Sequence, residues 1–252
     1  MKIFPAIDIK DKKCVRLIKG DFDNKTEYEM SPIDQAQKYK DHGFKNLHIV
    51  DLDGALSGET VNLVLIEKIV SKFDLKIEIG GGVRTFESVQ KYIDSGADKV
   101  ILGSAAIKDK NFLKEACSRF PNKIALGLDA KDGFLSVSGW KESSNKLTLD
   151  FLKEVNDFGV SRLIYTDINK DGTKSSPNFI ETEKIAEISN AGILFMSSFV
   201  YGTPEYSPID EKHPVRALNP YMSSKILAEE ICSQISRLKA IPLVILRGFH
   251  IY

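Results

Sequence analysis

The stretch IEIGGGVR at residues 77–84 decides the fold class of this chain. A short apolar run ends in three glycines, and a helix is predicted to start just after them, at Thr85. The unit VILGSAA at residues 100–106 repeats the pattern, with an apolar run that again ends in glycine. Continuous apolar runs of this length are typical of parallel strands that are covered on both faces. The stretch therefore predicts strand–loop–helix units and an α/β fold with a parallel sheet.

The same alternation continues on both sides of this stretch. Strands are predicted at residues 2–7, 47–50, 76–79, 99–102, 124–128 and 163–166. Serine or threonine opens each clear helix and glycine stops it, with starts at Ser31, Thr85 and Thr148 and stops at Gly43, Gly96 and Gly159. Alternation of this kind predicts either a barrel or a doubly wound sheet.

An internal repeat favours the barrel. The segment AIDIKD at residues 6–11 resembles GLDAKD at 127–132, and HIVDLDG at 48–54 resembles IYTDINKDG at 164–172. Each time, an apolar strand runs into aspartate and a polar loop. Two similar halves, each with several strand–helix units, predict a (β/α)8 TIM-barrel fold made by duplication.

Glycine loops after two neighbouring strands indicate a phosphate site. Gly81 and Gly82 follow one strand, and Gly103 and Ser104 follow the next. Glycine lets the backbone approach an oxyanion closely, and a helix N-terminus offers free N–H groups and a favourable dipole. The alternative for either loop alone is a tight turn that needs a positive φ. Two adjacent loops favour the phosphate site.

A symmetric pair of carboxylates indicates acid–base chemistry. Asp8 and Asp129 occupy equivalent points of the two halves, at the carboxyl ends of predicted strands. In a parallel barrel those ends form the active-site mouth. Two carboxylates there can divide the roles of acid and base if their environments separate their pKa values. A helix cap or a loop hydrogen bond is the alternative for either residue alone.

Other polar side chains are predicted around the same mouth. Asp51, Thr166, Asp167 and Asp171 all follow or end predicted strands. Trp140 is the only tryptophan, and it follows a short β-like run at residues 134–137. It either stacks on a heterocycle or fills the core.

Four segments resemble the HisA-type isomerases of histidine biosynthesis: FPAIDIKDKKCVRLIKGDF at 4–22, HIVDLDGALSG at 48–58, EIGGGVRTFESVQKYIDSGADKVILGSAA at 78–106 and TDINKDGTKSSPN at 166–178. The resemblance covers about residues 1–192 in the family's order and spacing. It implies a barrel that performs an Amadori rearrangement, in which a phosphorylated aminoaldose becomes an aminoketose. The implied substrate is a ribotide with two phosphates, and no cofactor or metal is needed.

The resemblance also implies roles for individual residues. Asp8 matches the general base that takes the sugar C2 proton, and Asp129 matches the proton donor that helps open the ring. Asp171 matches an alternative donor, and Thr166 belongs to the same catalytic group. One phosphate would be held by Gly81, Gly82, Gly103 and Ser104, and the rest of the substrate would contact Asp51, Arg16 and Trp140.

The resemblance ends near residue 192. Both the repeat and the family require a second phosphate site there, on strands ending in Ser-Gly-Gly and Gly-Lys-Ala, and neither motif occurs. FMSSFVYGTPEYSPIDEKHPVRALNPYMSSKILAEE at 195–230 instead resembles the extended short-chain dehydrogenases/reductases, especially NAD-dependent nucleotide-sugar epimerases and dehydratases. Their proton-relay triad would be Ser198, Tyr221 and Lys225. No G-x-x-G-x-x-G or G-x-G-x-x-G loop follows an early strand, so we expect a vestigial triad without a nicotinamide cofactor.

We therefore expect two segments, HisA-like barrel units at 1–192 and a foreign strand–helix–strand segment at 193–252. The second segment predicts strands at 193–197 and 242–247, a helix at about 220–238 and a surface loop at 201–219. An exposed edge on a six-stranded partial barrel favours aggregation. Two arrangements are therefore open. Either the barrel is incomplete, or the second segment supplies its last two strands and pairs with the strand at 163–166.

Three functions stay open from the sequence. The first is an isomerase whose activity is reduced or lost because one of two phosphate anchors is missing. The second is a non-catalytic phosphate-binding protein or an inactive chimera. The third is an NAD-dependent epimerase/dehydratase fragment, which the missing cofactor loop disfavours.

The composition disfavours some classes of binding partner. The 252 residues include 35 basic and 35 acidic side chains, so no charge field indicates binding to nucleic acid or a membrane surface. The odd number and wide spacing of the cysteines predict neither disulfides nor a metal site: Cys14, Cys117 and Cys232. The histidines are interpreted as structural or surface residues: His42, His48, His213 and His250. No signal-peptide run opens the sequence, so we expect a cytoplasmic protein. We also expect a monomer, with a small phosphorylated ribotide as its ligand.

Overall fold

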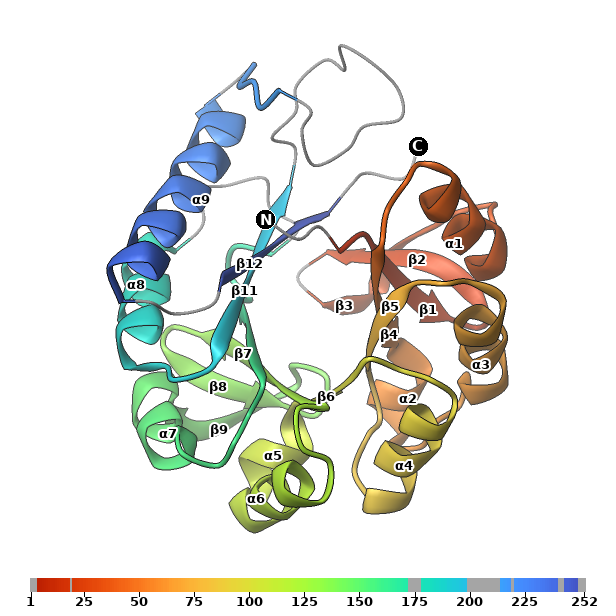
Figure 1. The fold of residues 1–252 in the computed structure, drawn as a ribbon, viewed down its shortest axis with the longest axis horizontal. Coiled ribbons are helices and arrows are strands. Elements are labelled where there is room, and N and C mark those ends of the chain that lie inside the picture. Colours follow the sequence, from red (N-terminus) through yellow and green to blue (C-terminus); the bar gives the residue numbers. More distant parts are fainter. Residues whose placement is uncertain are drawn as a thin grey trace.

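The computed structural model describes residues 4–18, 20–171, 178–198, 214–218, 220–239 and 243–248. Within these ranges a ring of helices surrounds a mostly parallel sheet (Figure 1). The ring comprises α1 (Pro32–Asp41), α3 (Leu63–Lys72), α4 (Phe86–Asp94), α6 (Lys110–Arg119), α7 (Thr148–Val155), α8 (Phe179–Ile188) and α9 (Pro220–Lys239). None of the helices in these ranges is long and apolar enough to cross a membrane.

Eight parallel strands form the body of the sheet. In spatial order they are β1 (Ala6–Lys10), β4 (Asn46–Asp51), β5 (Lys76–Gly80), β6 (Lys99–Leu102), β7 (Ile124–Lys131), β10 (Arg162–Asp167), β11 (Gly192–Ser198) and β12 (Leu243–Gly248). This succession of strands confirms the predicted (β/α)8 type of fold. Between the residues that the structure describes, no pairing joins β12 to β1, so the sheet is not closed.

Local capping signals explain where the predicted helices begin. At the start of α1, the Ser31 hydroxyl accepts a hydrogen bond from the Asp34 N–H at 3.2 Å. At α4, Thr85 and Ser88 form a reciprocal capping box. Both starts are those that the sequence predicts.

One predicted helix end is wrong, and the predicted start of the first strand is only partly described. The His48 N–H donates to the Pro5 carbonyl and the β1–β4 register begins at Ala6, while residues 2–3 lie outside the described residues. Helix α7 ends at Val155 rather than near Gly159, because the Phe158 N–H bonds the Val155 carbonyl three residues back. This tighter turn cannot continue an α-helix.

Two antiparallel hairpins stand at the carboxyl ends of β1 and β7. The first consists of β2 (Lys13–Ile18) and β3 (Asp21–Glu27), and the second of β8 (Phe134–Val137) and β9 (Glu142–Leu147). Each comes after one copy of the repeated Asp-containing segment. The β-like run predicted at residues 134–137 is β8.

The main core lies between the sheet and the helices. Ile49, Ile77 and Ile79 on the strands pack with Ile66 and Tyr92 on the helices in one fully buried cluster. Burying one such aliphatic side chain contributes about 1.5–3 kcal/mol. The three cysteines are free and buried, so the fold is held by packing rather than by disulfides.

The C-terminal segment continues the sheet. Strand β11 pairs in parallel with β10, starting with Gly192 opposite Arg162, and β12 pairs in parallel with β11. Helix α9 packs against α8. The expected pairing with the strand at 163–166 is therefore observed, while the foreign origin of the segment stays a prediction. Most of the surface loop expected at 201–219 lies outside the described residues, and residues 214–218 are exposed.

Candidate active site

A cavity of about 300 Å³ opens at the carboxyl ends of the parallel strands. Its lining comes from β1, β4, β5, β6, β7, β10 and both hairpins. The sequence-predicted site residues that line it are Asp8, Arg16, Gly81, Gly82, Gly103, Ser104, Asp129, Trp140, Thr166 and Asp171. The fold thus brings together residues from both repeated halves.

The glycine loop after β5 forms one wall of the cavity. Gly81 and Gly82 have φ values of 100° and 74°, which residues with side chains rarely adopt. A Cβ on Gly81 would lie 2.1 Å from the Asp51 carbonyl oxygen, and one on Gly82 would lie 2.5 Å from that of Glu59. Turn geometry and backbone packing therefore both require glycine. In the part of the chain that is described, neither glycine N–H donates a hydrogen bond.

The donors at this wall differ from those expected. The Ser88 N–H bonds the Thr85 hydroxyl and the Thr85 N–H bonds the Ser88 hydroxyl, both at 3.2 Å, so the first turn of α4 is already capped. The N–H groups of the glycine loop are available as donors, while the first turn of α4 is partly capped by its own side chains. Ser104 adds a hydroxyl, which accepts from the Ser138 N–H at 2.9 Å and keeps its own proton to donate.

Asp8 and Asp129 enter the cavity from β1 and β7, and both are partly exposed. Burial raises the pKa of both carboxyls above the ordinary value. At Asp8 this rise is opposed mainly by Arg16 and then by His48. At Asp129 the pKa rise is opposed mainly by hydrogen bonds from the Trp140 indole and the Thr166 hydroxyl. Interactions with basic side chains thus oppose the pKa rise most at Asp8, and hydrogen bonds from neutral donors oppose it most at Asp129.

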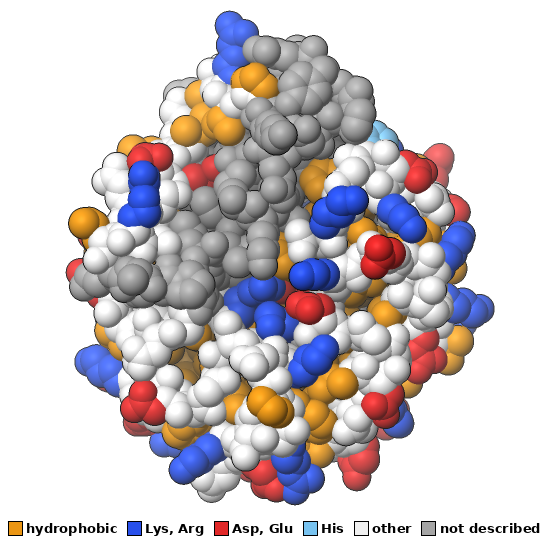
Figure 2. Space-filling view, in the orientation of Figure 1, with side chains coloured by type: hydrophobic (Ala, Val, Ile, Leu, Met, Phe, Trp, Pro, Cys, Tyr) orange, Lys and Arg blue, Asp and Glu red, His pale blue; other side chains and the backbone are white. Residues whose placement is uncertain are grey.

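A third carboxylate and its partner complete the mouth. Arg16 Nη2 on β2 lies 3.7 Å from Asp171 Oδ1, in the turn after β10. Asp171 raises the pKa of Asp8 and of Asp129, and Arg16 lowers that of Asp8. On the face drawn in Figure 2, Lys and Arg side chains are interspersed with Asp and Glu. The described part of the drawn face therefore shows no large field of a single sign.

Trp140 lines the cavity rather than filling the core. It comes from the β8–β9 turn and has a φ of 68°, an unusual value for a large side chain. Gly20 in the first hairpin packs on its ring, since a Cβ there would lie 2.2 Å from Trp140 Cε3. Lys141 Nζ lies 5.8 Å from the centroid of the Phe22 ring. The two hairpins therefore meet at the cavity.

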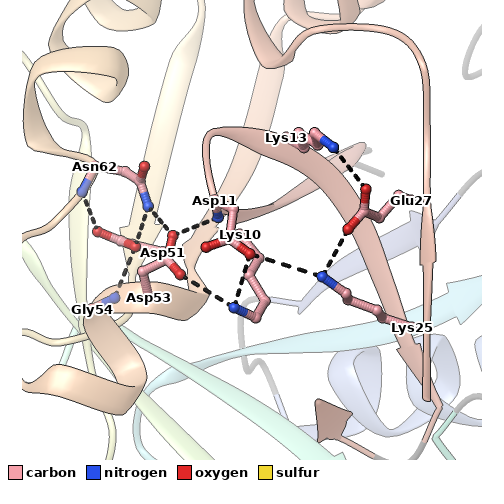
Figure 3. Close-up of polar contacts among 9 residues, drawn as sticks. All are labelled: Lys10, Asp11, Lys13, Lys25, Glu27, Asp51, Asp53, Gly54 and Asn62. Carbon is pink, nitrogen blue, oxygen red and sulfur yellow. Dashed lines mark hydrogen bonds and ion pairs between the residues drawn. The ribbon is translucent and has the colours of Figure 1, made fainter. Parts of the chain in front are cut away.

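Asp51 does not line the cavity. Its side chain is fully buried, and its carboxylate accepts from the Gly54 N–H, the Asn62 N–H and Asn62 Nδ2 at 2.7–2.9 Å (Figure 3). Asp53 accepts from Asn62 Nδ2 and from the Asp11 N–H. This cluster caps α2 (Leu52–Ser57) and ties it to the turn after β1. The geometry gives Asp51 a structural role, and its contact with substrate stays a prediction.

Two basic residues of the cavity lining are not among the site residues that the sequence predicts. His48 lines the cavity, and its Nδ1 lies 2.7 Å from Glu78 Oε1. Arg84 also lines it and donates to the Ala55 carbonyl at 3.3 Å. A signal for His48 exists in strand alternation: His48 precedes Val50 by two residues, and Val50 lies opposite Asp8.

The other predicted groups are not joined to this site. Ser198 lies in β11, and Tyr221 and Lys225 lie in α9, but the three side chains fall outside what the structure describes. Among the described residues, no group of three or more His, Cys, Asp or Glu side chains is arranged to hold a metal ion.

A family model described as "Histidine biosynthesis protein" matches residues 2–197. The chain belongs to this family. Within it, the chain is 79% identical over 194 residues to a protein of Pelagibacter ubique (strain HTCC1062), covering 77% of this chain and 81% of the relative. It is 45% identical over 196 residues to a protein of Lactococcus lactis, covering 77% and 82%.

These relatives within the histidine biosynthesis family share one printed name. Each is a 1-(5-phosphoribosyl)-5-((5-phosphoribosylamino)methylideneamino) imidazole-4-carboxamide isomerase. So is a protein of Oceanobacillus iheyensis, 43% identical over 194 residues that cover 77% of this chain and 81% of the relative. By family, the chain is an isomerase of histidine biosynthesis.

A second model, the "NAD dependent epimerase/dehydratase family", matches residues 174–252. The two matches overlap at residues 174–197. The second covers less than half of the chain, so it supports a resemblance of the tail and does not change the family.

Proposed function

We propose that this chain rearranges a bis-phosphorylated ribotide from an aminoaldose to an aminoketose, at a rate reduced by the loss of one phosphate anchor. The supporting observation is that Asp8, Asp129 and the free N–H groups of the glycine loop meet in one cavity. The relatives are named as isomerases of a compound with two phosphoribosyl groups. A cavity of about 300 Å³ suits part of such a ligand.

In this proposal Asp129 acts first as the acid. It gives a proton to the ring oxygen of the aminoaldose, the bond from C1 to that oxygen breaks, and the nitrogen lone pair forms a protonated imine at C1. Asp8 then removes the C2 proton, and the electron pair makes a C1–C2 double bond and a neutral enolamine. C1 regains a proton from Asp8 while the C2 hydroxyl gives one to Asp129. The aminoketose forms and both carboxyls end as they began.

The surroundings of the two carboxyls suit these roles. Arg16 and His48 favour the carboxylate form of Asp8, which a base needs. Burial raises the pKa of Asp129 and so favours the protonated form, which an acid needs. Thr166 and Trp140 hold this carboxyl by hydrogen bonds, and Trp140 is available to stack on the imidazole of the ligand.

One phosphate would bind the N–H groups of Gly81 and Gly82 and the Ser104 hydroxyl. The opposite phosphate would need the strand ends after residue 197, where the glycine motifs that the family resemblance requires are missing. Binding of remote groups contributes several kcal/mol of orientation in such reactions. We therefore expect kcat/KM to be lower than in a relative with both anchors, by roughly 10²–10⁴-fold.

The missing anchor also favours a second candidate function. The same cavity would bind a phosphosugar at the glycine loop without turning it over, as a non-catalytic or inactive chimeric protein. The match of the tail to NAD-dependent epimerases supports a third candidate, but the sequence has no dinucleotide loop. We expect a cytoplasmic monomer without cofactor.

Turnover of the ribotide by the purified protein separates these candidates. We expect slow turnover that Asp8→Asn abolishes and that Asp23→Asn leaves unchanged, since Asp23 is exposed on β3. Turnover that survives Asp8→Asn contradicts the assigned base. Binding of the phosphosugar without turnover supports the second candidate, and binding of a nicotinamide cofactor supports the third.

A further inference from the structure

A buried ionic network lies under the cavity. It consists of His48 on β4, Glu78 on β5 and Arg162 on β10, which are 7%, 0% and 6% exposed. Glu78 uses both oxygens: Oε1 lies 2.7 Å from His48 Nδ1, and Oε2 pairs with Arg162 Nη1. The Arg162 guanidinium carbon lies 4.9 Å from the centroid of the Phe4 ring. Three strands of the sheet are thus linked through one carboxylate.

Stability alone is a weak reason for such a network. Taking charges out of water costs several kcal/mol for each ion, and apolar side chains of similar volume often serve a core equally well. The network reaches the cavity at His48, which lines it. Because Nδ1 faces Glu78, Nε2 is the ring nitrogen left for the cavity side. The hydrogen bond at one imidazole nitrogen fixes the tautomer and the orientation of the ring.

We propose that His48 is a positioning residue for Asp8: Glu78, held by Arg162, fixes the imidazole in one orientation and so holds a basic group in the cavity wall that Asp8 shares. The inference rests on the proposed isomerase function, in which Asp8 must be ionised to remove the C2 proton. His48 lowers the pKa of Asp8, and it does the same at Asp129 across the cavity.

The remaining charged groups around Asp8 come from other elements. Arg16 on β2 lowers its pKa, and Asp171 after β10 raises it. The neutral side chains of Cys14 on β2 and Tyr39 on α1 also lie within its electrostatic reach. Lys99 on β6 interacts with Glu78 and Arg162 rather than with Asp8. His48 is among the main groups that shift the Asp8 pKa and Glu78 and Arg162 are not, so we expect an effect of Glu78 on Asp8 to pass through His48.

The test compares three variants by the pH dependence of kcat/KM. His48→Gln removes the imidazole, and Glu78→Gln keeps the shape of the side chain but removes the negative charge that pairs with His48 and Arg162. Tyr92→Phe is the control, since Tyr92 is equally buried and titratable but does not act on Asp8. We expect the acid limb to move up by about one pH unit in the first two variants and not in the control. A lower plateau with an unmoved acid limb in both variants overturns the proposal.

A second measurement keeps the proposal testable without turnover. In the full chain, ¹³C NMR follows the titration of the Asp8 carboxyl, and ¹⁵N NMR reports which nitrogen of His48 carries the proton. We expect Nδ1 of His48 to carry a proton whose signal Glu78→Gln changes, and an Asp8 titration that His48→Gln moves to higher pH. An Asp8 titration that is unchanged in His48→Gln overturns the proposal, whereas absent turnover with the expected NMR result overturns only the proposed function. If Glu78→Gln does not fold, Arg162→Lys replaces it and should shift the limb in the same direction.

Discussion

Two pairs of neighbouring parallel strands, β5–β6 and β11–β12, differ in the residues at their carboxyl ends. Both pairs are joined by the same kind of ladder, with Ile79 opposite Val100 in one and Phe195 opposite Ile245 in the other. The first pair leads into Gly81, Gly82 and Ser104, which line the cavity. The second pair lies where the match to the family ends, at residue 197. Two strand pairs with the same kind of backbone pairing therefore lead into residues of different chemistry.

The difference separates the requirements of a sheet from those of a phosphate site. A parallel ladder uses the N–H and C=O groups that every residue except proline has, so many apolar segments can extend it. The glycine loop needs two residues without Cβ atoms, because other backbone lies within 2.5 Å of where those atoms would be. A segment without such glycines can therefore extend the sheet without forming a phosphate site.

The largest expected effect comes from restoring the second strand pair. Replacing residues 198–252 with the corresponding segment of the Pelagibacter ubique relative should raise kcat/KM by roughly 10²–10⁴-fold, because a second phosphate anchor orients the ribotide. Steady-state kinetics measures the gain. The same exchange in the Asp8→Asn background should stay inactive. An exchange that leaves kcat/KM unchanged would place the limiting difference outside the tail.

Gly81→Ala tests the first strand pair. The new Cβ would lie 2.1 Å from the Asp51 carbonyl oxygen, so the loop must shift, and we expect a loss of about 3 kcal/mol or more in the free energy of unfolding. Phosphate binding should be lost with it. Gly43→Ala is the control: its φ of 81° is strained as well, but no atom lies within 4 Å, so about 1 kcal/mol is expected. Equal losses in urea titrations would mean that φ strain, not close packing, explains Gly81.

Sequence reasoning succeeds where the signal is local. The glycine loop, Asp8 and Asp129 stand at the ends of apolar runs, and one stretch of chain shows both the strand and the motif. It fails where the partner is distant. Asn62 holds the Asp51 carboxylate, and Glu78, itself paired with Arg162, holds His48 from another strand, although alternation along β4 does place His48 on the cavity side. The residue pattern along β4 does not show these partners, because they lie elsewhere in the chain.

Asp129→Asn should stabilise the fold at neutral pH. Burial raises the pKa of Asp129 in the folded state, so the folded state binds this proton more tightly than the unfolded state. The stability gained from that proton is present at low pH and is lost as the pH rises through the folded pKa. Asparagine avoids the burial of charge, so we expect a Tm a few degrees higher at pH 8, where 1 kcal/mol moves Tm by about 2–4 °C.

The pH dependence is the decisive part of this measurement. Calorimetry near pH 4, close to the ordinary aspartate pKa of 3.8, should show the Tm gain of Asp129→Asn disappearing. Asp23→Asn, on an exposed side chain, should show no such trend. A Tm gain that is equal at both pH values would assign the effect to packing. Burial of the Asp129 charge would then not lower the stability of the fold.

The smallest expected effect concerns the helix behind the glycine loop. Tyr92 on α4 is fully buried, and within the described residues its hydroxyl has no hydrogen-bond partner. A buried hydroxyl without a partner costs free energy, so Tyr92→Phe should raise the free energy of unfolding by up to about 1 kcal/mol in urea titrations. Phosphate affinity and kcat/KM should not change, because Tyr92 does not line the cavity. A loss of stability instead would mean that the hydroxyl is bonded in solution. The packing of α4 would then depend on a hydrogen bond of the Tyr92 hydroxyl, just as the loop before α4 depends on its glycines.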